Sequence, residues 1–561
     1  MSEHDFSRIP DAPQSHDQAL LDALAADLRA AGYTHDGVSG LLGEEADAAL
    51  NRDQLVPALL VLRRLLAEQS PAPVAVVTAF WLLGLDLPAA VLDAALPRTR
   101  AAGLLVLGLA EAGPDIPEAG GAGFGGPILR SAVDLRPHAS DADAELWVAS
   151  DLGAHQRPGV LRPDHVLGIG QASLTLAQTT IRPQVQTALD LGTGCGIQTF
   201  HLLSHVRRVV ATDISERALA FARFNLLLNH QALGLDPAHL EDRADLRLGS
   251  LLEPVAGERF DLVVSNPPFV ITPRTAGETA ADRFTYRDGG LPGDHLVAGL
   301  VAGIPGLLVP GGVAQLLANW EISEGDDGGN GAAREGDAWS AGPRSWVPEG
   351  IEAWFIQRET VSPSGYAETW LRDASEARDP DLYAARYASY LEDFASRRVR
   401  AVGFGMVWLR RPAVAGTAPF GQVFEEITYP IEQPVGPHLA AAVERADALA
   451  GLEGAPGRHR LDGAHLLVAD DVTEERHQRP GAEHPGVILL RQGAGLRRTT
   501  LLSTELAGFV SACDGDLSAG QIARALAALL DRDAGNLVPA LLDEAEDLVR
   551  KGFLLEMRNN R

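Results

Sequence analysis

The sequence contains few cysteines, a single lysine and no long apolar runs. Its 561 residues include two cysteines, Cys195 and Cys513, which excludes a disulfide-stabilised fold and is typical of a reducing cytosol. Lys551 is the single lysine, so arginine carries nearly all of the positive charge. Charged residues interrupt every apolar run well before the 18 residues of a membrane span, and residues 1–17 contain no apolar signal-peptide core. We therefore expect a cytoplasmic protein with no membrane contact.

Charge and length set further limits. The 47 basic and 75 acidic residues give a net charge of −28, which argues against general binding to polyanions. Hydrophobic residues make up 46 % of the chain, enough for packed cores, and the length predicts three or four domains.

Composition and periodicity divide the chain into four regions. Residues 1–113 show helical periodicity and predict a winged-helix-like domain or a plain helical cap. Residues 114–160 combine a Gly/Pro-rich linker with a pair of strands. Residues 161–412 form the central domain, with a mobile, acidic, Gly-rich insertion at 322–345. Residues 413–561 predict an α+β domain that ends in three helices, arranged as a winged-helix-like module or a helical packing domain.

The central region has the pattern of a parallel α/β sheet. Strand-like segments at 187–192 and 208–214 alternate with helical segments at 198–206 and 216–230. Further strands are expected at 245–250, 260–268 and 311–320, and the apolar segment 399–410 can join the same sheet. We expect a Rossmann-like, mostly parallel, seven-stranded sheet.

A glycine-rich turn follows the first of these strands. After Asp190 the chain reads Gly192-Thr193-Gly194-Cys195-Gly196, and a helix begins directly afterwards. Glycines allow a sharp turn and close approach of a ligand, and the helix N-terminus presents free N–H groups. Many nucleotide-binding folds share such a turn, so it does not identify the ligand alone.

Two further motifs sharpen this reading. Asp213 ends the next strand about 20 residues on, where a carboxylate can accept both hydroxyls of a ribose. Asn266-Pro267-Pro268-Phe269 follows a later strand. The three motifs, in this order, resemble those of the class I S-adenosylmethionine (SAM)-dependent methyltransferases, including large actinobacterial members. The resemblance covers about 150 of the 561 residues, and the flanks, which match no family that can be named, resemble the extensions of large actinobacterial methyltransferases.

The resemblance implies which residues hold SAM. The ribose would lie on Asp213, and Ser250 stands where many such enzymes place an acidic residue near the adenine. Gln171, Ser173 and Thr175, just before the glycine turn, are candidates for the methionine end. The remaining implied SAM residues are Asp190, Gly192, Gly194 and Gly196.

The N-P-P-F tetrapeptide is typical of enzymes that methylate a planar nitrogen. The side-chain oxygen of Asn266 and the carbonyl of Pro267 can accept N–H bonds and aim the nitrogen lone pair at the methyl group. Phe269 would stack on the flat acceptor group. We expect no metal, because His201 and His205 share helical spacing but no third ligand candidate lies near them.

The acceptor itself stays open between three alternatives. The N-P-P-F turn and the Gly289-Gly290 stretch resemble the HemK/PrmC release-factor glutamine methyltransferases, although Phe269 replaces their usual tyrosine. N-P-P-F also occurs in RsmC-like enzymes that methylate amino groups of guanine, and in adenine enzymes. Residues 181–320 carry 11 basic and 14 acidic residues, which favours a protein glutamine over RNA or DNA as substrate. The third alternative is a small molecule, methylated by a tailoring enzyme. A rival hypothesis of another class is a non-catalytic SAM-binding adaptor.

Overall fold

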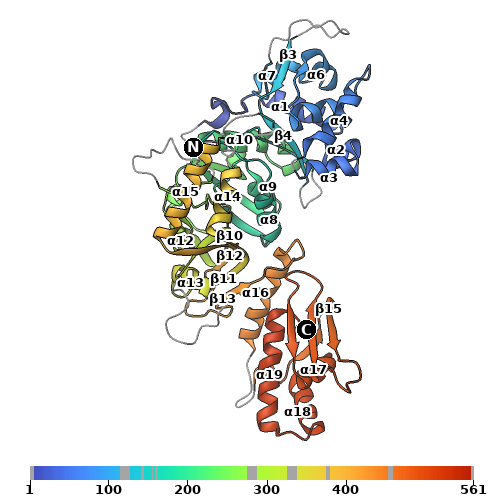
Figure 1. Ribbon diagram of the computed structural model, residues 1–561, viewed down its shortest axis with the longest axis vertical. Coiled ribbons are helices and arrows are strands. Elements are labelled where there is room, and N and C mark those ends of the chain that lie inside the picture. Colours follow the sequence, from blue (N-terminus) through green and yellow to red (C-terminus); the bar gives the residue numbers. More distant parts are fainter. Residues whose placement is uncertain are drawn as a thin grey trace. The chain divides into compact units, whose positions relative to one another are not determined.

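The structure is a computed structural model. It describes residues 5–52, 54–113, 127–139, 145–153, 156–157, 162–274, 287–324, 338–373, 379–452 and 459–557. The chain forms two compact units (Figure 1). The first comprises Met1–Ala177, Pro183–Ile351 and Phe355–Ala413, and the second Gln178–Arg182, Glu352–Trp354 and Val414–Arg561.

A twisted sheet forms the centre of the first unit. The whole sheet has eight described strands, one more than the seven expected, in the order β13-β11-β12-β10-β9-β6-β7-β8, with β13 (Gln422–Glu426) at its edge. Neighbours from β10 to β8 are parallel, and β12 is antiparallel to β10. This confirms the predicted mostly parallel α/β core. The other strands are β6 (Val185–Leu191), β7 (Val206–Asp213), β8 (Ala244–Leu248), β9 (Phe260–Ser265), β10 (Leu308–Ser323), β11 (Glu352–Val361) and β12 (Val399–Arg410).

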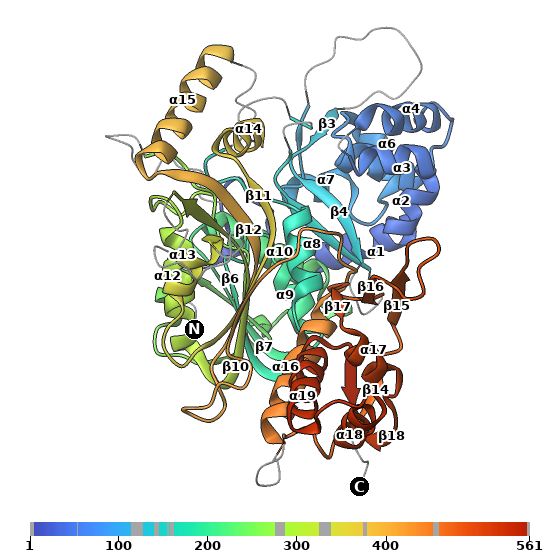
Figure 2. The same ribbon diagram turned by 60° about the horizontal axis from the view of Figure 1, so that its bottom comes forward.

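Helices cover both faces of this sheet. Helices α9 (Ile197–Leu203) and α10 (Glu216–Leu228) lie on one face, and α12 (His295–Gly303) and α13 (Ala341–Trp346) on the other (Figure 2). Because both faces are covered, strands β6, β7 and β9 are runs of buried apolar residues rather than alternating ones.

The strand order reverses between β6 and β9. The chain runs outward from β6 through β7 to β8, then returns to the other side of β6 as β9 and β10. Such a switch point leaves a crevice at the carboxyl ends of the two strands, where α/β proteins bind ligands. The glycine turn and the N-P-P-F turn follow β6 and β9, and Asp213 and Ser250 lie at the ends of the neighbouring strands β7 and β8.

The N-terminal part of the first unit contains a small helix–sheet module. Helices α5 (Pro73–Val77), α6 (Ala89–Ala95) and α7 (Arg100–Val106) accompany a sheet of order β1-β3-β2. The strands are β1 (Leu87–Pro88), β2 (Ala110–Ala112) and β3 (Ile128–Ser131), and β3 lies inside the range predicted as linker. The winged-helix-like arrangement expected for this part of the chain stays a prediction. Helices α1 (Gln18–Ala31), α2 (His35–Leu42), α3 (Glu44–Leu50) and α4 (Leu55–Leu66) precede it.

The predicted strand pair before the core is an antiparallel hairpin. Strands β4 (Asp134–Ala139) and β5 (Glu145–Ser150) pair along their whole length. Two buried side-chain amides, Asn225 of α10 and its C-cap Asn229, hydrogen-bond to the backbone of β5. Each amide accepts the main-chain N–H and donates to the main-chain carbonyl of one residue, Ala149 and Trp147 respectively, at 2.7–2.9 Å. Helix α10 is therefore buried between the sheet and the hairpin.

The predicted insertion at 322–345 needs correction at both ends. Strand β10 continues to Ser323, and residues 338–345 are helical rather than mobile. Trp339 is buried and stacks on Trp320 at 5.5 Å, so an aromatic contact orders this end. The part between, 325–337, lies outside the described residues. Helices α14 (Pro363–Asp373) and α15 (Pro380–Ser396) follow between β11 and β12.

The second unit is an α+β assembly with its own core. Helices α16 (Gly436–Gly451), α17 (Thr504–Ser511), α18 (Ala519–Leu529) and α19 (Ala534–Lys551) accompany two three-stranded sheets. One contains β18 (Asp514–Ser518), β14 (His465–Val468) and β19 (Leu554–Glu556), and the other β15 (Val472–His477), β16 (Val487–Gln492) and β17 (Thr499–Leu502). Strand β13 (Gln422–Glu426) also belongs to this unit. Across the described residues, no helix is both long and apolar enough to cross a bilayer.

Candidate functional site

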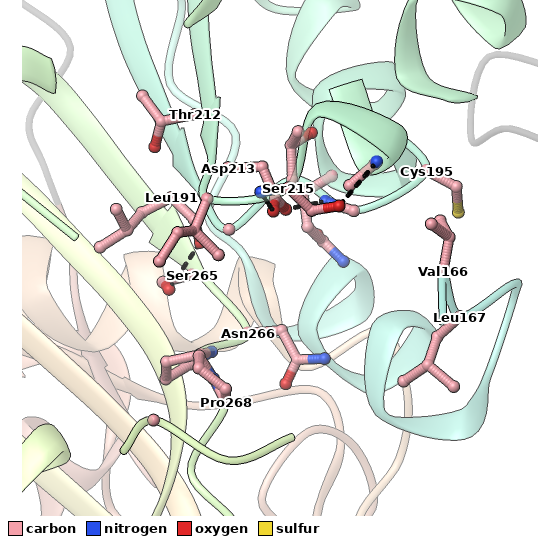
Figure 3. A pocket seen from close by; sticks show the side chains of 18 of the residues that line it. Val166, Leu167, Leu191, Cys195, Thr212, Asp213, Ser215, Ser265, Asn266 and Pro268 are labelled. Carbon is pink, nitrogen blue, oxygen red and sulfur yellow. Dashed lines mark hydrogen bonds between the residues drawn. The ribbon is translucent and has the colours of Figure 1, made fainter. Parts of the chain in front are cut away.

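One pocket gathers most of the predicted site residues at the carboxyl ends of β6, β7, β8 and β9. Its walls include the glycine turn, Asp213, Ser250 and the Asn266-Pro267-Pro268 turn. Figure 3 shows Asn266 extending from the end of β9 toward the segment that carries Val166 and Leu167. Strands that are adjacent in the sheet but distant in the sequence thus deliver their motifs to one place.

The glycine turn has the backbone that its composition predicts. Gly192 and Gly194 have φ values of +76° and +55°, which residues other than glycine rarely adopt. A Cβ atom at either position would meet no atom within 4 Å, since both residues face the open pocket. Gly196 is the N-cap of α9 and is not among the described lining residues; a Cβ atom added to it would lie 3.6 Å from the Cα of Ala222.

Asp190 lies beneath the turn. Its carboxylate accepts hydrogen bonds of 2.7 Å from the hydroxyls of Thr193 and Thr199, and it is 1 % exposed. Burial raises its pKa to about 6. Asp190 is not among the described residues that line the pocket. It therefore braces the turn, and sequence reasoning did not identify the two threonines that bind it.

Asp213 joins the turn to the next strand. One carboxylate oxygen accepts the N–H of Gly194 at 3.0 Å and the other accepts the N–H of Ser215 at 2.9 Å. Burial raises the pKa of this carboxyl group. Its backbone carbonyl accepts the N–H of Gly249 at 3.0 Å, which brings Ser250 to the pocket wall. Asp213 is thus fixed by three neighbouring segments at the pocket edge.

Asn266 is the polar group that opens into the pocket from β9. Its Oδ1 atom is buried and has no hydrogen-bond partner among the described residues. The preceding residue, Ser265, is anchored by a 2.8 Å hydrogen bond from its hydroxyl to the carbonyl of Leu191. The carbonyl of Pro267 accepts the N–H of Phe269 at 2.8 Å, which leaves it one further lone pair.

Phe269 occupies a different place from the other N-P-P-F residues. It is half-buried and does not belong to the described lining residues. Its backbone forms an isolated bridge with Asp288, and the next residue, Val270, donates its N–H to the carbonyl of Arg287 at 2.8 Å. This places Asp288 and Gly289 in the pocket wall. The predicted stacking role of Phe269 stays a prediction.

Several lining residues had no sequence signal of their own. They include Leu296 and Leu300 on α12, and the segment from His165 to Gly168. Ser173, one of three candidates before the turn, also lines the pocket. His201, considered for metal binding, has its Nε2 atom 3.3 Å from Nε2 of buried His138.

The residues present fit a bound SAM. Two glycines leave an open cradle, Asp213 lies at the pocket edge where the ribose is expected, and the amide oxygen of Asn266 has no partner among the described residues. Main-chain N–H groups at the start of α9 suit a carboxylate.

Comparison with known proteins agrees with this geometry. Residues 154–286 match the model of the methyltransferase small domain, and residues 30–120 match a domain of unknown function, DUF7059. A release factor glutamine methyltransferase from Moorella thermoacetica is 37 % identical over 135 residues, covering 23 % of this chain and 44 % of the relative.

Two further relatives cover similar regions. A ribosomal protein uL3 glutamine methyltransferase from Bradyrhizobium diazoefficiens is 31 % identical over 159 residues, covering 28 % of this chain and 46 % of its own length. A release factor glutamine methyltransferase from Bordetella pertussis is 34 % identical over 176 residues, covering 30 % and 59 %. The chain thus spans about half the length of the curated relatives that it matches.

Proposed function

We propose that the region 154–286, which matches the methyltransferase small domain model, binds S-adenosylmethionine, and that the protein methylates a glutamine side-chain amide of a protein substrate. The observation that carries this proposal is the buried Oδ1 atom of Asn266 with no partner in the described chain. A buried acceptor without a hydrogen bond costs roughly 1–3 kcal/mol, so the site favours a ligand that brings an N–H group.

Residues on three strand ends would hold the cofactor. Gly192 and Gly194 would receive its methionine end, Asp213 its ribose hydroxyls, and Ser250 its adenine. When bound, SAM supplies a methyl group on a positively charged sulfur. Asp190 contributes indirectly, through the hydroxyls of Thr193 and Thr199 that shape the turn.

Asn266 and Pro267 would prepare the acceptor. An amide nitrogen is a poor nucleophile, since its lone pair is delocalised into the carbonyl. The Oδ1 atom of Asn266 and the free lone pair of the Pro267 carbonyl can accept its two N–H bonds and orient it. Oriented in this way, the nitrogen would present its lone pair to the methyl group that bound SAM would supply, and the sulfur would leave with the bonding electron pair. One proton leaves the nitrogen to water afterwards, so no strong base is needed.

The charges around the site support a protein substrate over a nucleic acid. Arg274 follows the N-P-P-F turn but is paired with Asp288. On the small helix–sheet module, Arg100 in α7 pairs with Asp93, and nearby Arg98 pairs with Asp27. Phosphate recognition needs unpaired cations on a basic surface, whereas these cations are matched by carboxylates.

The test is methyl transfer from labelled SAM with purified acceptors. Separate reactions contain a release factor, ribosomal protein uL3 and total RNA from the source organism, and mass spectrometry locates the methyl group. We expect label on a glutamine, loss of at least 100-fold in rate in Asn266→Ala, and retained SAM binding by that variant. The exposed variant Asn536→Ala is the matched control. Label in RNA alone, or equal turnover by Asn266→Ala, would overturn the proposal.

A further inference from the structure

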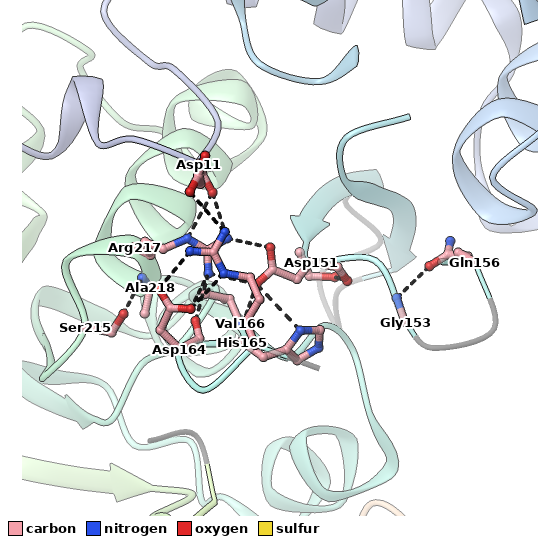
Figure 4. A network of polar contacts seen from close by, with 12 residues as sticks. Asp11, Asp151, Gly153, Gln156, Asp164, His165, Val166, Ser215, Arg217 and Ala218 are labelled. Carbon is pink, nitrogen blue, oxygen red and sulfur yellow. Dashed lines mark hydrogen bonds and ion pairs between the residues drawn. The ribbon is translucent and has the colours of Figure 1, made fainter. Parts of the chain in front are cut away.

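A buried arginine outside the predicted motifs gathers three separate stretches of chain beside the cofactor pocket. Arg217 lies in the first turn of α10, two residues after Ser215, and is 6 % exposed. Figure 4 shows its guanidinium between Asp11, Asp151 and Asp164. These residues come from the N-terminal segment, the end of the β4–β5 hairpin and the segment that precedes helix α8 (Gln171–Thr179).

All five N–H donors of this guanidinium have partners. The Nε and Nη2 atoms donate to the carbonyl of Asp11 at 2.9 and 2.7 Å. Nη1 and Nη2 bind the two carboxylate oxygens of Asp151 at 3.0 and 2.7 Å, and Nη1 also donates to the carbonyl of Asp164 at 2.8 Å. A planar, saturated fork of this kind fixes the positions of its partners, which a lysine could not do.

The same carboxylate holds part of the pocket wall. Asp151 Oδ2 accepts the N–H of Val166 at 2.8 Å, and the N–H of Asp151 donates to the carbonyl of Val166 at 3.1 Å. Val166 lies in the segment His165–Gly168, which lines the pocket. On the other side of Arg217 in sequence, Ser215 and Ala218 also line it. One cation therefore connects two walls of the pocket.

We infer that Arg217 is a positioning residue for SAM: it holds the segment His165–Gly168 in place through Asp151, without touching the ligand. Two of its partners, Asp11 and Asp151, lie before the residues that match the methyltransferase domain model. SAM affinity thus depends on the N-terminal part of the chain. This inference rests on the proposed binding of SAM and not on the proposed methyl acceptor.

The test compares three variants of the full-length protein by isothermal titration with SAM. Arg217→Gln removes the cation, and Asp151→Asn keeps the shape of the side chain while removing its charge. Arg498→Gln is the matched control, because Arg498 is also largely buried, forks onto Glu425 and belongs to the second unit. Hydrogen exchange of a peptide covering residues 162–168 reports the position of the pocket wall directly.

We expect SAM to bind about tenfold more weakly, or worse, in Arg217→Gln and Asp151→Asn, and with unchanged affinity in Arg498→Gln. The 162–168 peptide should exchange faster in the first two variants, and SAM should protect it less. If Arg217→Gln does not fold, Asp151→Asn decides alone. Unchanged SAM affinity in a variant with a lowered melting temperature would show a purely structural role and overturn the inference. No acceptor protein is involved, so failure here leaves the proposed function untouched.

Discussion

Replacing Tyr366 by phenylalanine should destabilise the backbone just after the N-P-P-F turn without changing the residues of the turn itself. The Tyr366 hydroxyl, on α14, accepts the N–H of Ile271 at 2.8 Å and an N–H of the Asn319 amide at 3.1 Å. Ile271 is 1 % exposed and Asn319 is fully buried. Ile271 follows the N-P-P-F turn by two residues, so this hydroxyl connects the turn to helix α14.

The expected cost follows from the groups left behind. Phenylalanine keeps the ring stacked on Phe404 at 5.7 Å and perpendicular to Phe394 at 5.5 Å, so no cavity larger than one oxygen forms. The N–H of Ile271 then lacks an acceptor in a water-free place. An unsatisfied buried polar group costs about 1–3 kcal/mol, and we expect the free energy of unfolding to fall by that amount.

Urea unfolding followed by tryptophan fluorescence measures this change. The relevant transition is the one that SAM shifts to higher urea, because a ligand stabilises the unit that binds it. The control is Tyr387→Phe, whose half-exposed hydroxyl contacts Glu368 at 3.3 Å and should change stability by less than about 0.5 kcal/mol. Equal midpoints for Tyr366→Phe and wild type would refute the reasoning.

Three further predictions concern the pocket and the cysteines. The pKa of Asp190 is raised to about 6, so protonation of this carboxyl group contributes roughly 3 kcal/mol of stability below about pH 4, and that contribution is lost as pH rises through 6. Asp190→Asn should remove this part of the pH dependence of stability in urea titrations from pH 4 to 7. An unchanged profile would contradict the prediction. Gly192→Ala should weaken SAM binding at least about tenfold in calorimetry, whereas Gly257→Ala, with a φ of +84° outside the pocket, should suffer similar backbone strain and bind SAM normally. Burial raises the pKa values of Cys195 and Cys513 to about 12. A thiol reagent at pH 8 should therefore label neither cysteine in the native protein and both in urea. Rapid labelling of the native protein would refute this prediction.

The local order of elements in the core could be predicted because its signals are local. The strand–glycine turn–helix unit around Gly192 and the strand that ends at Asp213 follow from composition and periodicity alone. The place of β12 could not be predicted. It is the last strand of the sheet in this unit, yet it inserts between β10 and β11 and runs antiparallel to β10, and such a pairing depends on contacts about 90 residues apart.

The side-chain directions at the site were harder to predict than the positions. Asp190 was expected to face SAM, but at the end of β6 its carboxylate turns under the loop, toward two threonine hydroxyls. Phe269 follows two prolines, and its backbone bridges to Asp288; it is not among the described residues that line the pocket. The segment around Val166 carries no motif. Its position depends on long-range contacts with Asp151 and Arg217, which leave no local signal in the sequence.

The two ends of the pocket are built on different physical principles, and this difference constrains the acceptor. At the end proposed for SAM, Asp213 and, beneath the glycine turn, Asp190 are already hydrogen-bonded within the chain, which fixes their geometry before any ligand arrives. At the other end, the Oδ1 atom of Asn266 is buried with no partner in the described chain. A buried, unsatisfied oxygen lowers stability in the free protein and is satisfied only when a donor enters. A methyl acceptor with no N–H or O–H donor, such as a thioether or a tertiary amine, would leave that cost in place, whereas an amide nitrogen removes it as it binds.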